Sequence, residues 1–154
     1  MNTAANAPID TPLAVLGAGS WGTALAIQFA RAGRPTRLWS RDPAQTRSMA
    51  RERANARYLP EAKFPELLTV ATDLDAALEG ATDVLIAVPS HGFRALLHEL
   101  ASRLRAETRL AWATKGFELD TGLLPHQVAL EVLGASRSFA VLSGPTFARE
   151  VGKG

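Results

Sequence analysis

Three glycines in one short segment constrain this chain more than any other feature of its sequence. The segment Gly17-Ala-Gly-Ser-Trp-Gly22 follows an apolar run at residues 13–16 and opens a helical pattern over residues 21–32. In such a loop, Gly17 permits a tight turn, Gly19 lets a ligand approach the backbone, and Gly22 lets the helix pack against the strand. Backbone N–H groups at the start of the helix then face an anion. The segment therefore predicts a dinucleotide-binding loop rather than a glycine-rich turn with no ligand.

The rest of the chain repeats this strand-then-helix order. Strands are expected at residues 13–16, 36–39, 68–71, 83–88, 109–113 and 138–142. Helices are expected at residues 21–32, 43–56, 74–80, 92–104 and 121–133. Alternation of this kind is typical of a parallel sheet with helices on both faces. We therefore predict the α/β class, a Rossmann-type, doubly wound, mainly parallel sheet with strand order 3-2-1-4-5-6.

Local signals set the ends of several predicted elements. Gly33 stands just past the first helix, and Asp42 followed by Pro43 is a capping residue with proline at the first helical position. Asp73 and Ser90 are expected to cap the third and fourth helices. We predict a flexible tail at residues 1–12, a single cofactor-binding domain at residues 13–154, and a loop at residues 57–67.

Composition excludes several classes of protein. The chain has 154 residues and no cysteine, which rules out disulfides, zinc held by cysteine and thiol catalysis. Its net charge of +2 is too small to indicate a nucleic-acid partner, and its apolar runs are too short to span a membrane. No metal site is predicted, and we expect a cytoplasmic protein. Eight arginines between residues 31 and 57 indicate either a solvated helix face or a positive field for a phosphorylated ligand.

The end of the second predicted strand bears on the choice of cofactor. NAD sites usually place Asp or Glu there to bind the ribose 2′-hydroxyl. This chain has Ser40-Arg41 instead, and Arg41 can bind a 2′-phosphate, whereas Asp42 is better explained as a helix cap. The sequence therefore favours NADP(H), and NAD(H) remains possible.

Three further segments follow predicted strands at the same edge of the sheet. His91 comes after the fourth strand, where an acid–base role and a structural role are both open, the structural one being favoured. Lys115 comes after the fifth, pointing either into the crevice or into solvent. Gly144 and Thr146 come after the sixth.

Together these motifs resemble the N-terminal domain of bacterial NAD(P)-dependent sn-glycerol-3-phosphate dehydrogenase. The resemblance runs from residue 13 to residue 154 and includes the blocks GAGSWGTAL (residues 17–25), LWSRD (residues 38–42), VPSH (residues 88–91), ATKG (residues 113–116) and LSGPTFAREV (residues 142–151). An asparagine at residue 55 and YLP at residues 58–60 also match. The last two of the long blocks are the most specific to the family.

The resemblance implies roles for individual residues. Ser20, Trp21, Arg41 and Ala148 would contact the cofactor, beside the three glycines of the loop. Lys115 would face both cofactor and substrate, while Gly144 and Thr146 would line the substrate site. The implied reaction is reversible reduction of dihydroxyacetone phosphate to sn-glycerol 3-phosphate, which feeds phospholipid synthesis.

The resemblance also implies two missing parts. The family's proton-transferring lysine is expected beyond Gly154, as is its helical substrate domain, so no catalytic residue is assigned within this chain. We therefore expect the chain alone to bind cofactor with little or no turnover. An apolar patch near Phe147 and Val151 is expected to drive homo-oligomers.

Two alternative hypotheses of function remain open. A related Rossmann enzyme, such as a ketopantoate or pyrroline-carboxylate reductase, is disfavoured by the blocks around Lys115 and Thr146. A dinucleotide-binding module without catalysis is the other alternative, and the motif on the substrate side disfavours it.

Overall fold

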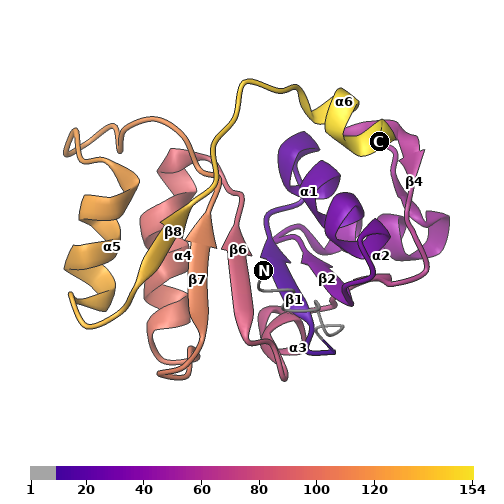
Figure 1. Cartoon of the computed structure of the whole chain (residues 1–154). Coiled ribbons are helices and arrows are strands. Elements are labelled where there is room, and N and C mark those ends of the chain that lie inside the picture. Colours follow the sequence, from indigo (N-terminus) through magenta and orange to yellow (C-terminus); the bar gives the residue numbers. More distant parts are fainter. Residues whose placement is uncertain (1–9) are drawn as a thin grey trace, which may run out of the picture.

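A six-stranded parallel sheet forms the centre of the computed structural model, which describes residues 10–154 (Figure 1). Its strand order is β5-β2-β1-β6-β7-β8. The strands are β1 (Leu13–Leu16), β2 (Thr36–Trp39), β5 (Leu68–Val70), β6 (Asp83–Ile86), β7 (Arg109–Trp112) and β8 (Phe139–Val141). The predicted fold class and strand order are confirmed. Most of the predicted tail lies outside the described residues.

Helices cover both faces of this sheet, as Figure 1 shows. Leu13 and Val15 of β1 pack into one apolar cluster with α1 (Ser20–Arg31) and α2 (Pro43–Glu52). The alternate residues, Ala14 and Leu16, pack into a second cluster with α3 (Leu74–Leu78), α4 (Ser90–Ala101) and α5 (Pro125–Leu133). All four of these β1 residues are buried, as expected of a strand covered on both sides.

Three of the four predicted helix-capping signals, at Gly33, Asp42 and Asp73, are confirmed. Asp42 Oδ1 accepts the N–H of Ala44 at 2.8 Å, and Asp73 Oδ1 accepts the N–H of Ala76 at 2.8 Å. Gly33 has φ +87° just past α1. The predicted cap Ser90 is wrong by one position, because Pro89 stands at the cap of α4 and Ser90 is its first helical residue.

The prediction for residues 43–67 is wrong in part. α2 ends at Glu52 because Arg53 turns into the left-handed region, with φ +50°, and its guanidinium donates to the carbonyls of Leu68 and Pro65 at 3.0 and 2.7 Å. The predicted loop contains β4 (Leu59–Lys63), which pairs with β3 (Ala54–Asn55) in an antiparallel ribbon. This β3–β4 ribbon contributes Leu59 and Ala62 to the apolar cluster that β1 forms with α1 and α2, here called the α1 cluster.

Two features near the C-terminus also differ from expectation. α5 begins at Pro125, later than predicted, and residues 148–153 form a short helix, α6 (Ala148–Lys153), that was not predicted. Figure 1 shows α6 beside α1 and β4. Val151 packs against the α1 cluster, whereas Phe147 is 74% exposed, so only Phe147 of the expected apolar pair is open to solvent.

Within residues 10–154, no helix is long and apolar enough to cross a membrane.

Candidate functional site

The glycine loop lies where the order of strand addition reverses. β1 pairs with β2 on one side and with β6 on the other, and the loop leaves the carboxyl end of β1. Gly17 has φ +115°, and a Cβ there would lie 2.6 Å from the carbonyl oxygen of Ala87, just after β6. A Cβ at Gly22 would lie 1.9 Å from the carbonyl oxygen of Gly17, whereas one at Gly19 would meet no atom within 4 Å. Gly17 and Gly22 are therefore required by packing, and Gly19 faces open space.

Hydrogen-bond donors are left free at the start of α1. The first bond of the helix runs from the N–H of Thr23 to the carbonyl of Gly19. Among residues 10–154, no acceptor is found for the N–H groups of Gly19, Ser20 and Trp21. The indole Nε1 of Trp21 is buried and likewise has no partner among these residues. A polar ligand in front of the loop would satisfy the three backbone N–H groups, and an anion would do so best because of the helix dipole.

Arg41 follows the end of β2 and lines the cavity there. Its guanidinium donates to Glu99 of α4 at 2.8 Å, and both side chains are about half exposed. Asp42 accepts two backbone N–H groups as the cap of α2 and forms a looser ion pair with Arg57 at 3.7 Å. Asp42 is therefore the cap of α2, as predicted. Of these two residues, only Arg41 lines the cavity.

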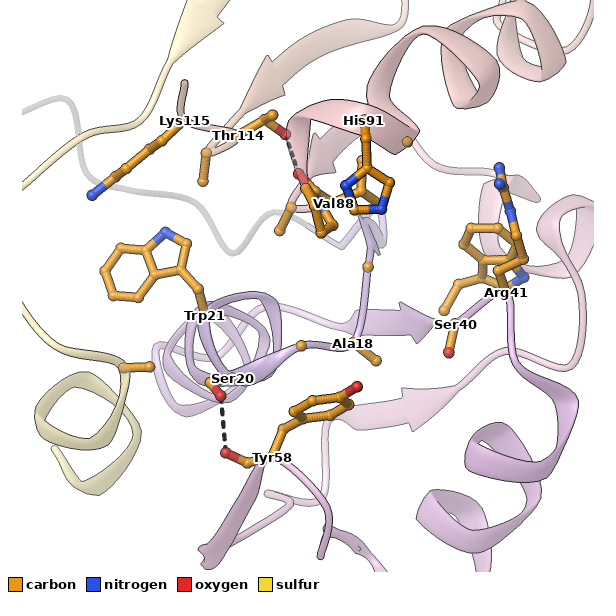
Figure 2. Close-up of a pocket in the computed structure, with 18 of the residues that line it drawn as sticks. Ala18, Ser20, Trp21, Ser40, Arg41, Tyr58, Val88, His91, Thr114 and Lys115 are labelled. Atoms are coloured by element: carbon orange, nitrogen blue, oxygen red, sulfur yellow. Dashed lines mark hydrogen bonds between the residues drawn. The ribbon is translucent and has the colours of Figure 1, made fainter. Parts of the chain in front are cut away.

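The opposite wall comes from the segments after β6 and β7. Lys115 extends toward Trp21, with Nζ 5.8 Å from the centre of the indole ring. Thr114 donates its hydroxyl to the carbonyl of Val88 at 2.7 Å, which ties the two strand ends together. His91 lies on the same wall, at the start of α4. Figure 2 shows Lys115 and Trp21 at one end of the cavity and Arg41 and Ser40 at the other.

An ion-pair network holds the segment that follows Lys115. Arg94 of α4 donates through Nε and Nη2 to the two carboxylate oxygens of Glu118, both at 2.8 Å, and also to Glu131 of α5. Thr121 donates its hydroxyl to Glu118 as well. The hydrogen bonds from Arg94 and Thr121 lower the pKa of Glu118 to about 2. The Lys115 segment is thereby anchored at Glu118, three residues further along the chain.

The remaining predicted residues are placed unequally. Thr146 and Ala148, with Phe147 between them, line the cavity beside the start of α1. Gly144 is not among the lining residues, and the nearest atom to a Cβ built there is the hydroxyl of Thr146 at 4.0 Å. Together with Gly17, Gly19, Ser20, Trp21, Arg41 and Lys115, eight of the ten predicted site residues therefore line one cavity, and Gly22 and Gly144 do not.

That cavity fits a dinucleotide. Its volume is about 820 Å³, within the range of natural ligand pockets, and it runs past the glycine loop from Lys115 to Arg41. The residues with free backbone N–H groups, Gly19, Ser20 and Trp21, line it between the cations Lys115 and Arg41. Among the described residues no group of three or more histidines, aspartates or glutamates gathers as a metal site.

Three site residues were not assigned a role from the sequence. Gln45 of α2 and Tyr58 of the β3–β4 turn line the cavity, and Asn55 lies buried behind the glycine loop. Asn55 and Tyr58 stand in a motif that the resemblance includes, but their placement depends on the β3–β4 ribbon, which was predicted as helix and loop. No local pattern marks Gln45.

Comparison with known proteins agrees with this geometry. Residues 12–154 match the family model described as the N-terminus of NAD-dependent glycerol-3-phosphate dehydrogenase. The chain belongs to this family. The family that the sequence resembles is thus confirmed.

Individual relatives of this glycerol-3-phosphate dehydrogenase domain agree with the family. Glycerol-3-phosphate dehydrogenase NAD(P)+ from Yersinia pestis (strain Pestoides F) is 51% identical over 142 residues, which are 92% of this chain and 42% of that protein. The crystal structure of glycerol-3-phosphate dehydrogenase from Coxiella burnetii matches with a TM-score of 0.90 and 46% identity, over 95% of this chain and 44% of that one. The chain thus spans less than half the length of these relatives.

A more distant structure shares the fold alone. Pyrroline carboxylate reductase from Plasmodium falciparum matches with a TM-score of 0.57 and 14% identity, over 84% of this chain and 40% of that one. The higher identity of the dehydrogenases separates this chain from the related reductases considered above.

Proposed function

We propose that this domain binds NADP(H), and less tightly NAD(H), across the carboxyl edge of the sheet. The observation that carries the proposal is the glycine loop at the reversal of strand order, with its free N–H groups between Arg41 and Lys115. The loop would hold the diphosphate, because unpaired donors at a helix start favour an anion. Arg41 would pair with the 2′-phosphate, and Ser20, Trp21 and Ala148 would line the path between.

We propose further that the domain is the cofactor-binding half of an enzyme that reduces dihydroxyacetone phosphate to sn-glycerol 3-phosphate. The bound nicotinamide supplies the hydride. Lys115 would hold the substrate's phosphate or oxygens near the nicotinamide, and Thr146 would offer its hydroxyl at the same end. Gly144 would allow the backbone to approach the substrate. None of these residues is proposed as the proton-transferring group.

The family names of the relatives support this assignment, since the Yersinia protein is a glycerol-3-phosphate dehydrogenase that is named for NAD(P)+. Because the chain spans 42% of that relative, we assign it cofactor binding, and assign the complete reaction to the whole protein. We expect the 154-residue chain by itself to oxidise little or no NADPH when dihydroxyacetone phosphate is added. Clear turnover by the chain alone would contradict this expectation.

Isothermal titration calorimetry tests the proposal for both ligands. NADPH is titrated into the chain first, and sn-glycerol 3-phosphate is then titrated into the NADP⁺-loaded chain. Lys115→Met keeps an unbranched side chain of similar length but removes its charge, so we expect sn-glycerol 3-phosphate to bind about tenfold more weakly or not at all. Lys63→Met, an exposed substitution on β4, serves as the control. Equal binding of sn-glycerol 3-phosphate by wild type and Lys115→Met would overturn the role of Lys115.

A further inference from the structure

The carbonyl of Ala18, inside the glycine loop, is held by two side-chain amides from outside it. Gln45 donates through Nε2 at 2.7 Å, and Asn55 donates through Nδ2 at 2.9 Å. Gln45 comes from α2 and Asn55 from β3, so two separate elements converge on one backbone oxygen. Asn55 is 1% exposed and does not line the cavity.

The hydrogen bonds of Asn55 are fully specified. Its amide donates a second bond to the Thr23 hydroxyl at 2.8 Å, and its Oδ1 accepts the N–H of Tyr58 at 3.3 Å. Both amide protons and the amide oxygen therefore have partners, so the side chain has one preferred orientation. Buried and satisfied, it fixes the Ala18 carbonyl more rigidly than a solvent-exposed donor would.

The orientation of that carbonyl determines where the next donor points. A trans peptide is planar, with its C=O and N–H directed to opposite sides, and the described chain has no cis peptide. With the Ala18 carbonyl held toward Gln45 and Asn55, the N–H of Gly19 is directed away from them. This N–H is one of those for which no acceptor is found in residues 10–154.

We propose that Asn55 and Gln45 are positioning residues that fix the Ala18–Gly19 peptide so that its N–H binds the cofactor diphosphate. The proposal rests on the proposed function, because it concerns the same site. In this proposal, the β3–β4 ribbon stabilises the conformation of the glycine loop. The Ser20 hydroxyl, which donates to the Tyr58 carbonyl at 3.0 Å, is a second tie between ribbon and loop (Figure 2).

Two matched variants separate this role from general packing. Asn55→Leu keeps the size of the side chain and removes its bond to Ala18, whereas Thr23→Val removes the other acceptor of the same amide and leaves Ala18 held. We expect Asn55→Leu to weaken NADPH binding about tenfold and Thr23→Val to change it less than about twofold, although both lose a buried hydrogen bond. Gln45→Met alone should weaken binding several-fold, and the double variant by more than the product of the two single effects.

The second readout needs no dinucleotide. Inorganic pyrophosphate is titrated into ¹⁵N-labelled chain, and the amide resonance of Gly19 is followed. We expect saturable shifts of this resonance in wild type and Thr23→Val, and smaller shifts at the same concentrations in Asn55→Leu. If Asn55→Leu does not fold, Gln45→Met, whose side chain is only partly buried, gives the answer by the same two measurements.

The possible results distinguish this inference from the proposed function. NADPH binding by wild type with equal affinity in Asn55→Leu, or an equal loss in Thr23→Val, would overturn the positioning role and leave cofactor binding standing. Pyrophosphate shifts at Gly19 without NADPH binding would overturn the proposed cofactor and support the positioning role. Absence of both in folded wild type would overturn the two together.

Discussion

Arg41 can pair with two acidic groups, which are Glu99 in the protein and the 2′-phosphate of the proposed ligand. Its ion pair with Glu99 is about half exposed on both sides, and such pairs contribute only about 0–1 kcal/mol. A 2′-phosphate, with more charge and more acceptor oxygens, can therefore displace Glu99 at small cost. The bond to Glu99 also holds the arginine at the rim of the cavity before the ligand arrives.

This competition predicts opposite effects for the two partners. Arg41→Ala is expected to weaken NADPH binding about tenfold and to leave NADH nearly unchanged. Glu99→Gln is expected to strengthen NADPH binding by about twofold to fivefold, since Arg41 is released and a nearby negative charge is removed. Parallel titrations of each variant with NADPH and NADH measure both effects. A loss shared equally by the two cofactors in Arg41→Ala would remove Arg41 from the choice of cofactor.

Two glycines on helices give a second test at the scale of single residues. A Cβ at Gly22 would lie 1.9 Å from a backbone oxygen, so Gly22→Ala must move the loop, and we expect a loss of about 3 kcal/mol or more in the free energy of unfolding. Gly92 in α4 has open space around it, and Gly92→Ala is expected to stabilise the chain by about 0.5–1 kcal/mol. Urea denaturation measures both. Equal stability of Gly22→Ala and wild type would contradict the close packing of α1 on β1.

Charged residues also tie whole elements together. Arg94 joins α4 to α5 and to the segment between β7 and α5. At the amino end of β6, burial raises the pKa of Asp83, but hydrogen bonds from Arg109 and Arg34 lower it by more, so that it lies below its usual value. Asp83 and Glu118 therefore stabilise the fold through these bonds only when their carboxylates are ionised.

Glu118 makes this dependence on pH measurable. Because its pKa falls from 4.5 in the unfolded chain to about 2 in the folded chain, its contribution is fully present above about pH 4.5 and is lost as the pH falls through 2. We expect Glu118→Gln to lower Tm at pH 7, and the gap to wild type to close as the pH falls from 5 toward 2. Glu66→Gln, an exposed carboxylate with no ion pair among residues 10–154, is the control. A gap that stays constant down to pH 2 would contradict the coupling of Glu118 to Arg94.

Several large apolar side chains are exposed in the segments that follow β7 and β8 and on the edge strand β8 itself. Phe147 is 74% exposed and Leu119 86%, and Val141 on the edge strand β8 is also exposed. Edge strands and open apolar side chains favour association. We propose that the chain forms homo-oligomers through such exposed apolar residues, and expect Phe147→Ser to weaken them. Light scattering over a range of concentrations measures the effect, and a wild-type monomer at high concentration would contradict it.

The sequence predicted the sheet because its signals are local. The strands contain short groups of apolar residues near turn residues, and helix-capping residues such as Asp42 act within three positions. The β3–β4 ribbon was missed because it depends on distant contacts: Arg53 ends α2 by binding carbonyls 12 and 15 residues away. The same is true of α6, which Gln28 and Arg31 of α1 hold by donating to carbonyls more than 100 residues further along.

The candidate site was also predictable from the sequence only in part. The glycine loop, Arg41 and Lys115 stand at strand ends, where their positions follow from the order of the sheet. Asn55 and Gln45 act through a single backbone oxygen, and no spacing in the sequence reveals that contact. The cavity-lining residues at the strand ends were therefore predictable, whereas Gln45, Tyr58 and Asn55 were found only in the structure.

Tryptophan fluorescence measures cofactor binding, on which the proposed function and the role of Asn55 both depend. Trp21 and Trp39 both line the cavity, whereas Trp112 is buried in the core. Titration with NADPH and NADH should give saturable quenching, tighter for NADPH, and Trp21→Phe and Trp39→Phe should each remove part of the signal. A folded chain whose fluorescence neither cofactor changes, and which binds neither by calorimetry, would contradict cofactor binding at this cavity.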